Sequence, residues 1–272
     1  MKNVNYKIIM PTTQKYLDIS LNFIELLKRN WPESIQNVVL SVSGTFNSRN
    51  PLFNQVKIFE NPDETSLPNC VYNASKKYKA DLYLVFLGDA FIAKRVDTNK
   101  INNLLNRLID NKIQYCRLLP QIYLKKSGND NNLFRYIRTD ERYSHSFVAF
   151  AATNSFISSE FSTEETDRDF EIKYLKLVIS NDNHIYKDRA ILIKNIFHIL
   201  PSIQKGKWDL FNYFYLKRKY PDIEFSNERE KISLGFELVL YARKFSLPFT
   251  SNRFRIKIKQ LLSKTGYFDT KI

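Results

Sequence analysis

The stretch LYLVFLGDAFIAKRVD, residues 82–97, begins with the most strongly apolar run of the chain and then presents a single carboxylate, Asp89. A short apolar run of this kind, bounded by turn residues, is typical of a strand buried on both faces of a sheet. In open α/β sheets, ligands bind beyond the carboxyl ends of the parallel strands. Asp89 is therefore a candidate ligand-binding residue. A carboxylate that merely turns the chain after a core strand is an equal alternative.

The segments before residue 82 alternate between strand and helix patterns. YKIIM (6–10) predicts a short buried strand that stops at Pro11, and apolar residues at helical spacing predict a helix over 16–31. VVLSV (38–42) predicts a second strand, and residues 71–80 a second helix. Such alternation indicates a parallel sheet covered by helices.

The same reasoning gives the elements that follow residue 97. We expect helices over 97–111 and 208–220, strands over 113–120 and 190–200, and a helix opened by a capping box of Ser162 and Glu165.

Composition and charge restrict the partners of the chain. Its 272 residues are 43% hydrophobic, enough for a full core, and 42 Lys and Arg against 28 Asp and Glu give a net charge of +14. This excess favours phosphate, anionic lipid or an acidic polymer. Two distant cysteines suggest neither a disulfide framework nor a zinc site, and no apolar run is long enough to span a bilayer. We expect a cytoplasmic protein, either free or peripheral on the inner face of the plasma membrane.

Four segments, in their order along the chain, resemble bacterial GT-A-fold glycosyltransferases of capsular, exo- and lipopolysaccharide biosynthesis. They are MPTTQKYLDISLNFIELLKRNWP (10–32), ADLYLVFLGDAFIAKRVDTNKINNLLNRLIDNKIQYCRLLP (80–120), DRDFEIKYL (167–175) and QKGKWD (204–209). The resemblance covers roughly residues 6–215. It implies an α/β, GT-A-like fold with a mixed, mainly parallel central sheet flanked by helices. Residues 1–210 would form the catalytic domain, and residues 211–272 a helical, basic C-terminal extension.

The resemblance also implies a donor site. Three residues match the loop expected near the nucleotide: Pro11, Thr12 and Thr13. Asp89 matches one acid of the motif that binds the metal or the sugar nucleotide, whereas Gly88 and Ala90 depart from the acid and the Tyr that flank it in relatives. A lone carboxylate supplies little of the coordination that a divalent cation needs. Asp89 is thus a candidate ligand for Mn or Mg, and metal-independent transfer stays open.

Two acids on one predicted helix are candidate catalytic bases. A carboxylate at this place can take the proton from an acceptor hydroxyl as it attacks the sugar. The resemblance favours Glu171 over Asp169 for this role. Acids in a first helical turn also complement the helix dipole, and on the sequence alone this structural role is favoured.

Two lysines flank Gly206 in QKGKWD. By the resemblance, Lys205 and Lys207 would offset the charge of the departing nucleotide diphosphate. A solvated basic turn is the alternative.

The C-terminal residues are strongly basic. Between Arg243 and Ile272 there are eight Lys or Arg and one acid, Asp269, with apolar residues interleaved. Such a segment can lie on an anionic membrane surface, or dock on its own domain as a helix with a solvated basic face.

Together these features predict a glycosyltransferase of the hexosyltransferase type. It would move a sugar from a nucleotide-sugar donor to a growing, lipid-linked surface polysaccharide, alone or in a homo- or hetero-oligomer. One alternative is a catalytically degenerate accessory subunit of a transferase complex, which the missing acid at Gly88 favours. The other is a nucleic-acid-binding basic protein, against which stand the placement of the aromatic residues inside strands and helices and the lack of a recognition motif.

Overall fold

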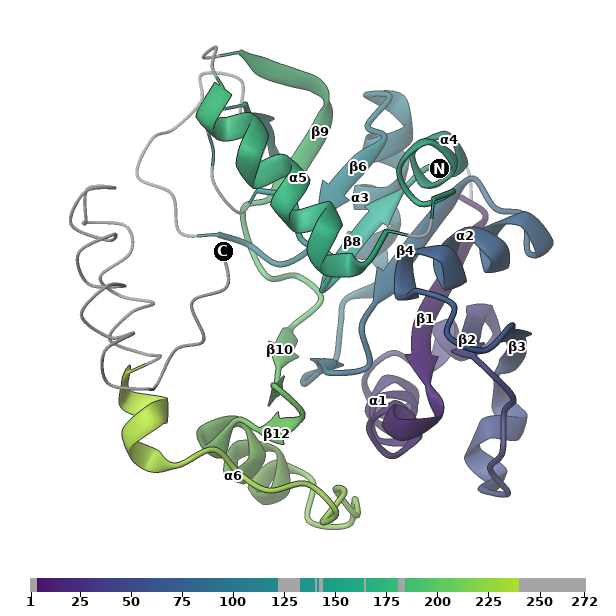
Figure 1. Cartoon of the computed structure of the whole chain (residues 1–272), viewed down its shortest axis with the longest axis vertical. Helices are drawn as coiled ribbons and strands as arrows, with labels where there is room; N and C mark the ends of the chain where they lie inside the picture. The colour runs from purple at the N-terminus through teal and green to yellow at the C-terminus, as the bar shows by residue number, and fades with distance from the viewer. Residues whose placement is uncertain are drawn as a thin grey trace.

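Figure 1 shows the fold of the chain, obtained as a computed structural model. The structure describes residues 4–121, 133–139, 141, 144–163, 165–180 and 184–239. Its centre is an eight-stranded sheet in the order β3-β2-β1-β4-β8-β6-β9-β7. The strands are β1 (Tyr6–Thr13), β2 (Val38–Ser43), β3 (Lys57–Asn61), β4 (Leu82–Phe86), β6 (Tyr115–Arg117), β7 (Phe134–Arg138), β8 (Ala149–Ala152) and β9 (Ile185–Leu192).

The sheet is mixed and mainly parallel. β4, β1, β2 and β3 pair in parallel, as do β6 and β9, whereas β8 runs antiparallel between β4 and β6 and β7 runs antiparallel to β9. The predicted fold class is therefore confirmed: an α/β protein with helices on both faces of a mainly parallel sheet.

β4 explains why the sheet carries two cores. Leu82, Leu84 and Phe86 belong to the core beneath α1 and α3, whereas Tyr83 and Val85 belong to the core beneath α2, α4 and α5. Every residue of β4 is buried, as the sequence predicted. The helices are α1 (Leu17–Asn30), α2 (Leu67–Lys77), α3 (Thr98–Asp110), α4 (Asn154–Glu160) and α5 (Asp167–Ser180), with short 3-10 turns at Gln14–Tyr16, Pro32–Asn37 and Pro51–Gln55.

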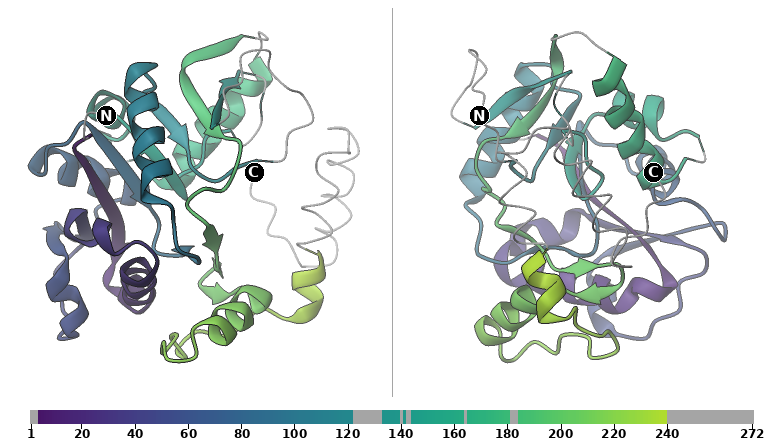
Figure 2. Two further views of the ribbon diagram at one scale, coloured as in Figure 1. Left: turned by 180° about the vertical axis from the view of Figure 1, so that it is seen from behind. Right: turned by 60° about the vertical axis from the view of Figure 1, so that its left-hand side comes forward.

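A smaller unit is attached below the carboxyl edge of the sheet (Figures 1 and 2). After β4 the chain turns into β5 (Ala90–Ile92), which pairs antiparallel with β10 (Ile199–Pro201). β11 (Ile203–Gln204) and β12 (Lys207–Trp208) then form a hairpin that leads into α6 (Leu210–Lys219).

Some predicted elements differ from the structure. The apolar run 190–200 is not one strand, because residues 193–198 turn between β9 and β10. The helix predicted from residue 208 begins at Leu210, since Trp208 belongs to β12. The capping box consists of Thr166 and Asp169 rather than Ser162 and Glu165, because α5 begins at Asp167.

β1 does not stop at Pro11 but continues to Thr13. Its last pair with β4 is Ile9 with Val85, and beyond it only β2 pairs with β1. Proline lacks an N–H donor, so it is tolerated where a strand is paired on one side only.

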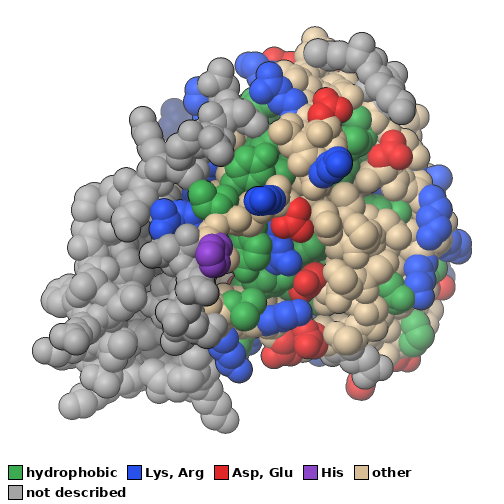
Figure 3. Space-filling view, turned by 90° about the horizontal axis from the view of Figure 1, so that it is seen from above, with side chains coloured by type: hydrophobic (Ala, Val, Ile, Leu, Met, Phe, Trp, Pro, Cys, Tyr) green, Lys and Arg blue, Asp and Glu red, His purple; other side chains and the backbone are tan. Residues whose placement is uncertain are grey.

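No helix within the described residues is both long and apolar enough to cross a bilayer. Figure 3, seen from the amino-edge side of β1 and β4, shows acidic and basic side chains interspersed over the described surface rather than one basic field. The predicted basic segment 243–272 lies outside the described residues, and the domain boundary at residue 210 stays a prediction.

Substitution of Leu84 by Ala is expected to lower the free energy of unfolding by about 2–5 kcal/mol, because the side chain is fully buried at the centre of β4. Ile109 on α3 is 39% exposed, so Ile109→Ala is expected to cost less than about 1 kcal/mol. Urea unfolding of both variants measures the difference. Equal losses would mean that β4 is not the centre of the core.

Candidate functional site

The carboxyl edge of the central strands gathers several loops. β8 begins beside the end of β4, because it runs antiparallel to it. The N–H of Leu87 donates to the carbonyl of Val148 at 2.9 Å, and the N–H of Leu118 donates to that of Ala149 at 3.0 Å. Residues 87–89, which contain Asp89, therefore lie next to the loop 144–148.

Asp89 occupies the turn between β4 and β5, and its side chain is half-buried. Its carbonyl accepts a hydrogen bond from the N–H of Ser202 at 3.0 Å, which fixes the turn against the end of β10. Burial raises the pKa of the Asp89 carboxyl to about 6. Among the described residues no Lys, Arg or His forms an ion pair with it. A carboxylate held in this way without a cation is typical of a functional site.

The first turn of α1 packs against Gly88 and Thr12. A Cβ placed on Gly88 would lie 3.6 Å from Cγ2 of Ile19 and 3.7 Å from Oγ of Ser20. The buried hydroxyl of Thr12 lies 2.9 Å from the same Ser20 oxygen. Thr12 thus holds α1 in place and does not present its hydroxyl to a ligand. Pro11 is buried, and Thr13 is half-buried at the end of β1.

A cavity of about 400 Å³ opens where the chain leaving β1 meets the β11–β12 hairpin. We call it the lysine cavity. Its lining comprises Lys15, Lys205, Gly206, Lys207, Glu228, Arg229 and Glu230. The lining thus brings Lys205 and Lys207 together with Lys15, and it contains none of the other predicted donor-site residues, Pro11, Thr12 and Thr13. Asp89 is not part of this lining.

The hairpin has an unusual backbone at the cavity. Lys205 and Gly206 are the two loop residues, with φ of 50° and 78°. Positive φ at both positions is the geometry that matches the twist of a two-residue hairpin. Glycine adopts it freely, whereas for Lys205 it costs free energy. The two-residue turn is sufficient to explain the positive φ of Lys205.

The cations of the lysine cavity differ in availability. Lys207 donates to Glu230 at 2.6 Å, and this hydrogen bond lowers the pKa of the Glu230 carboxyl. Both partners are exposed, so the pair is weak. Within the described part of the chain, neither Lys15 nor Lys205 has an acidic partner. These two ammonium groups are therefore available to an anion.

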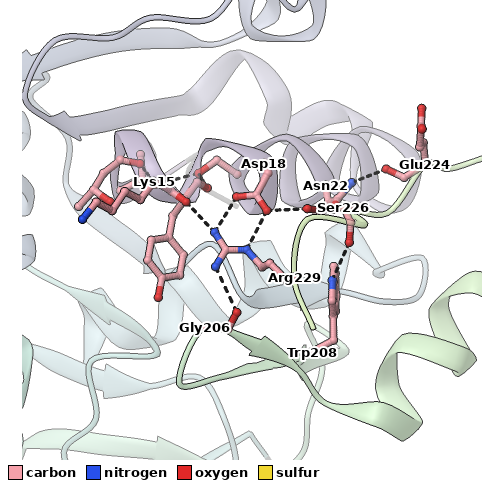
Figure 4. Close-up of polar contacts among 12 residues, drawn as sticks. Lys15, Asp18, Asn22, Gly206, Trp208, Glu224, Ser226 and Arg229 are labelled. Carbon is pink, nitrogen blue, oxygen red and sulfur yellow. Dashed lines mark hydrogen bonds and ion pairs between the residues drawn. The ribbon is translucent and has the colours of Figure 1, made fainter. Parts of the chain in front are cut away.

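Arg229 holds the wall of the cavity together (Figure 4). Its Nε and Nη2 donate to the two oxygens of Asp18 at 2.7 and 2.8 Å. Nη2 also donates to the carbonyl of Lys15 at 2.6 Å, and Nη1 to that of Gly206 at 3.2 Å. Its guanidinium lies 4.3 Å from the ring centre of Tyr16. Arg229 joins α1, the residues after β1 and the hairpin, and has little capacity left for a ligand.

The carboxylate of Asp18 is occupied by hydrogen bonds from Arg229 and Ser226. Its burial favours the neutral acid, but hydrogen bonds from Arg229 and Ser226 outweigh this and lower the pKa of the carboxyl. Ser226 further donates its N–H to Asn22 at 3.1 Å and accepts from Nε1 of Trp208 at 2.8 Å (Figure 4). The returning segment, residues 222–232, is thereby tied to both α1 and β12.

The two predicted catalytic acids have different surroundings. Oε1 of Glu171 accepts from Oγ of Ser146 and from the N–H of Phe147, both at 3.0 Å, so it is fixed against the loop that neighbours residue 87. Asp169 is exposed, and hydrogen bonds from Thr166 lower the pKa of its carboxyl. Asp169 therefore caps α5, and Glu171 is the acid that lies at the carboxyl edge. Neither belongs to the lining of the lysine cavity.

His145 is a core residue. It is buried, stacks on Tyr174 at 3.6 Å, and its two ring nitrogens lie 3.1 Å from Ser144 and Arg189. Burial and the charges of Arg189 and Arg117 lower its pKa well below the usual value, so the ring is neutral.

The described residues contain no group of three or more His, Cys, Asp and Glu suited to a metal ion. Asp89 is the one sequence-predicted ligand, so a divalent cation there would need phosphate oxygens and water to complete its coordination. Three residues of the site were not predicted from the sequence: Lys15, Asp18 and Arg229. No local pattern signals a pair such as Asp18 and Arg229, which lie 211 positions apart.

Neither a protein-family model nor a curated protein sequence matches this chain. Similar solved structures include S. aureus TarS, with 11% identity over 69% of this chain and 35% of that chain and a TM-score of 0.46. S. aureus TarS 1-349 in complex with UDP is 10% identical over 70% of this chain and 58% of that chain, with a TM-score of 0.45. A cytidylyltransferase from Leptospira borgpetersenii is 11% identical over 85% of this chain and 99% of that chain, with a TM-score of 0.43. The chain thus spans about a third of TarS. Similarity at this level carries no argument about activity.

The raised pKa of Asp89 predicts a pH-dependent stability. Between the ordinary value of 3.8 and about 6, the folded protein retains a proton that the unfolded chain has lost, so stability falls as pH rises through this window. Asp89→Asn removes the effect. We expect the variant to be as stable as the wild type near pH 4 and more stable by about 2 kcal/mol at pH 7. Urea unfolding at both values tests this, and a difference independent of pH contradicts it.

Removal of the Arg229 side chain is expected to leave the Asp18 carboxylate unpaired. We expect Arg229→Met to lower the free energy of unfolding by about 2–4 kcal/mol. Arg229→Lys should lower it by less, because lysine keeps the positive charge but cannot donate to both oxygens of Asp18 in the same bidentate geometry. Arg95 is exposed and has no ion pair with a described residue, so Arg95→Met is the matched control. Denaturant unfolding measures all three. A loss no larger than that of the control would show that Arg229 does not hold the wall.

Proposed function

We propose that this chain is a glycosyltransferase that binds a nucleotide sugar at the carboxyl edge of β1 and β4. The observation that carries the proposal is the lysine cavity, in which Lys15 and Lys205 have no acidic partner among the described residues. Its volume of about 400 Å³ falls within the range of small-molecule sites. Two ammonium groups suit the charge of a nucleoside diphosphate.

The cations have a chemical role beyond binding. When the glycosidic bond to the donor breaks, negative charge accumulates on the departing diphosphate. Fixed positive groups stabilise that charge more in the transition state than in the bound substrate, which is what accelerates the reaction. Lys205 and Lys15 would supply these groups. The hairpin turn holds the backbone of Lys205 and Arg229 holds the carbonyl of Lys15, whereas both side chains are exposed.

Asp89 would organise the sugar half of the donor. With a pKa of about 6 the carboxyl is mostly ionised at pH 7. In that form it accepts hydrogen bonds from sugar hydroxyls, or provides one oxygen to a divalent cation on the diphosphate. Glu171, fixed at the same edge by Ser146 and Phe147, is the proposed base for the acceptor hydroxyl.

The finer identity rests on the sequence resemblance. A growing, lipid-linked surface polysaccharide is the proposed acceptor, and the basic residues 243–272 that would accompany it on a membrane lie outside the described residues. One observation favours a second candidate, a degenerate accessory subunit: Gly88, where relatives have an acid, packs against the first turn of α1.

Calorimetric titration with UDP, CDP, GDP, ADP and dTDP, with and without manganese, tests the proposal. We expect one nucleotide to bind, and Lys15→Ala and Lys205→Ala each to raise its Kd about tenfold, as expected for the loss of a charge-assisted contact. Lys79 is an exposed lysine just before β4, at the opposite edge of the sheet, and Lys79→Ala should leave the Kd unchanged.

The same preparations separate the two candidates. Release of nucleotide from the matching nucleotide sugar, lost in Asp89→Asn, supports the transferase. Binding without release from any nucleotide sugar supports the accessory subunit. If none of the nucleotides binds, or if Lys79→Ala weakens binding as much as Lys205→Ala, the lysine cavity is not a donor site.

A further inference from the structure

α6 presents an apolar face to the outside of the molecule. Tyr213 and Leu216 are buried against the small unit, whereas Phe214 and Tyr215 on the outer side are 56% and 39% exposed. Among the described residues, six of the eleven exposed large hydrophobic side chains lie between positions 211 and 239. An exposed apolar surface of this kind marks an interaction site.

The charges on this helix have one sign. Leu210–Lys219 contains no acidic residue, and its last turn contains Lys217, Arg218 and Lys219. Lys219 donates to the carbonyl of Ala93 at 2.6 Å, so it is committed to the fold. Lys217 and Arg218 are exposed and have no ion pair with a described residue. α6 thus combines exposed aromatic rings with two exposed cations, of which Lys217 has its Nζ 5.8 Å from the ring centre of Tyr213.

The next helical residues, 234–239, extend this character. Leu234 and Leu238 are 54% and 56% exposed. The segment is joined to the start of α6, because Oε2 of Glu237 accepts from the N–H of Leu210 at 3.1 Å. Two neighbouring segments of the same unit therefore present apolar side chains to the outside.

We infer that the outer side of α6 docks on an anionic phospholipid surface. Aromatic side chains with nearby Lys and Arg suit the boundary between headgroups and acyl chains, where rings are buried and cations meet lipid phosphates. A second copy of the chain is a competing occupant, and a symmetric contact centred on the last turn of α6 would place Lys217 and Arg218 of both copies against each other. A nucleic acid would need a continuous cationic groove, and α6 offers two adjacent cations.

Docking through α6 would orient the chain with the β11–β12 hairpin near the membrane, where a membrane-bound substrate would lie. α6 is capped by Asp209, whose carboxylate accepts from the N–H of Asn212 at 2.9 Å, and it follows the β11–β12 hairpin without a linker. A bilayer bound to α6 would therefore lie close to the hairpin that carries Lys205. The inference itself does not depend on the proposed transfer reaction, because lipid binding is measured without nucleotide.

Flotation of the full chain with vesicles tests the inference. We expect binding to vesicles of 30% phosphatidylglycerol in phosphatidylcholine and at least tenfold weaker binding to phosphatidylcholine alone. Each cation near an anionic surface contributes about a factor of five, so Lys217→Ala with Arg218→Ala should weaken binding about 25-fold. Phe214→Ser with Tyr215→Ser should weaken it about tenfold through lost apolar burial.

Matched controls come from α3, whose Ile109 is 39% exposed and which Lys112 follows. Ile109→Ser and Lys112→Ala should change vesicle binding less than twofold, and thermal unfolding should show that all variants are folded. Equal binding to neutral and anionic vesicles overturns the inference. So does wild-type vesicle binding by both α6 double variants, binding of random oligonucleotides in place of vesicles, or a change in oligomeric state without a change in vesicle binding.

Discussion

The bidentate pair between Arg229 and Asp18 is the contact on which the candidate site depends. Both side chains are largely withdrawn from water, and each would be costly to bury alone. The pair, together with the bonds of Arg229 to the carbonyls of Lys15 and Gly206, determines where the returning segment crosses α1. The lysine cavity has walls from three distant parts of the chain, and this one guanidinium contacts all three. Its role is to position, and the cations left for a ligand are its neighbours.

The carboxyl edge of the sheet divides into two halves with different chemistry. On one side the lysine cavity is cationic and open. On the other side Glu171 is held by Ser146 and Phe147 against the loop beside Leu87. Asp89 lies in the turn between β4 and β5. Its carbonyl accepts a hydrogen bond from the N–H of Ser202, which leads into the β11–β12 hairpin. In the proposed site the diphosphate would lie near the lysines and the sugar toward the carboxylates.

Local patterns predicted the sheet and its helices because they depend on neighbours in sequence. β4 was predicted from a continuous apolar run, and α1 and α3 from apolar residues at helical spacing, and burial alone determines such elements. The turn at 193–198 escaped prediction because Ile193, Ile196 and Phe197 continue the apolar pattern of the strand before it. There Asn195 bonds both backbone groups of Ile199, and His198 has a φ of 52°. Lys205 and Lys207 were predicted from a short motif. Lys15, Asp18 and Arg229 were not, because their partnership exists only after the chain has folded.

Pro11 has a consequence for the shape of the edge. The pairing of β1 with β4 ends at Ile9 and Val85. Two residues further along β1, Pro11 has no backbone N–H to donate. A strand paired with β1 at this point would lack one hydrogen bond of the ladder. The two strands also part because β4 ends at Phe86, after which the chain turns toward β5. A longer ladder between β1 and β4 would have to pass residue 11, which has no N–H to donate.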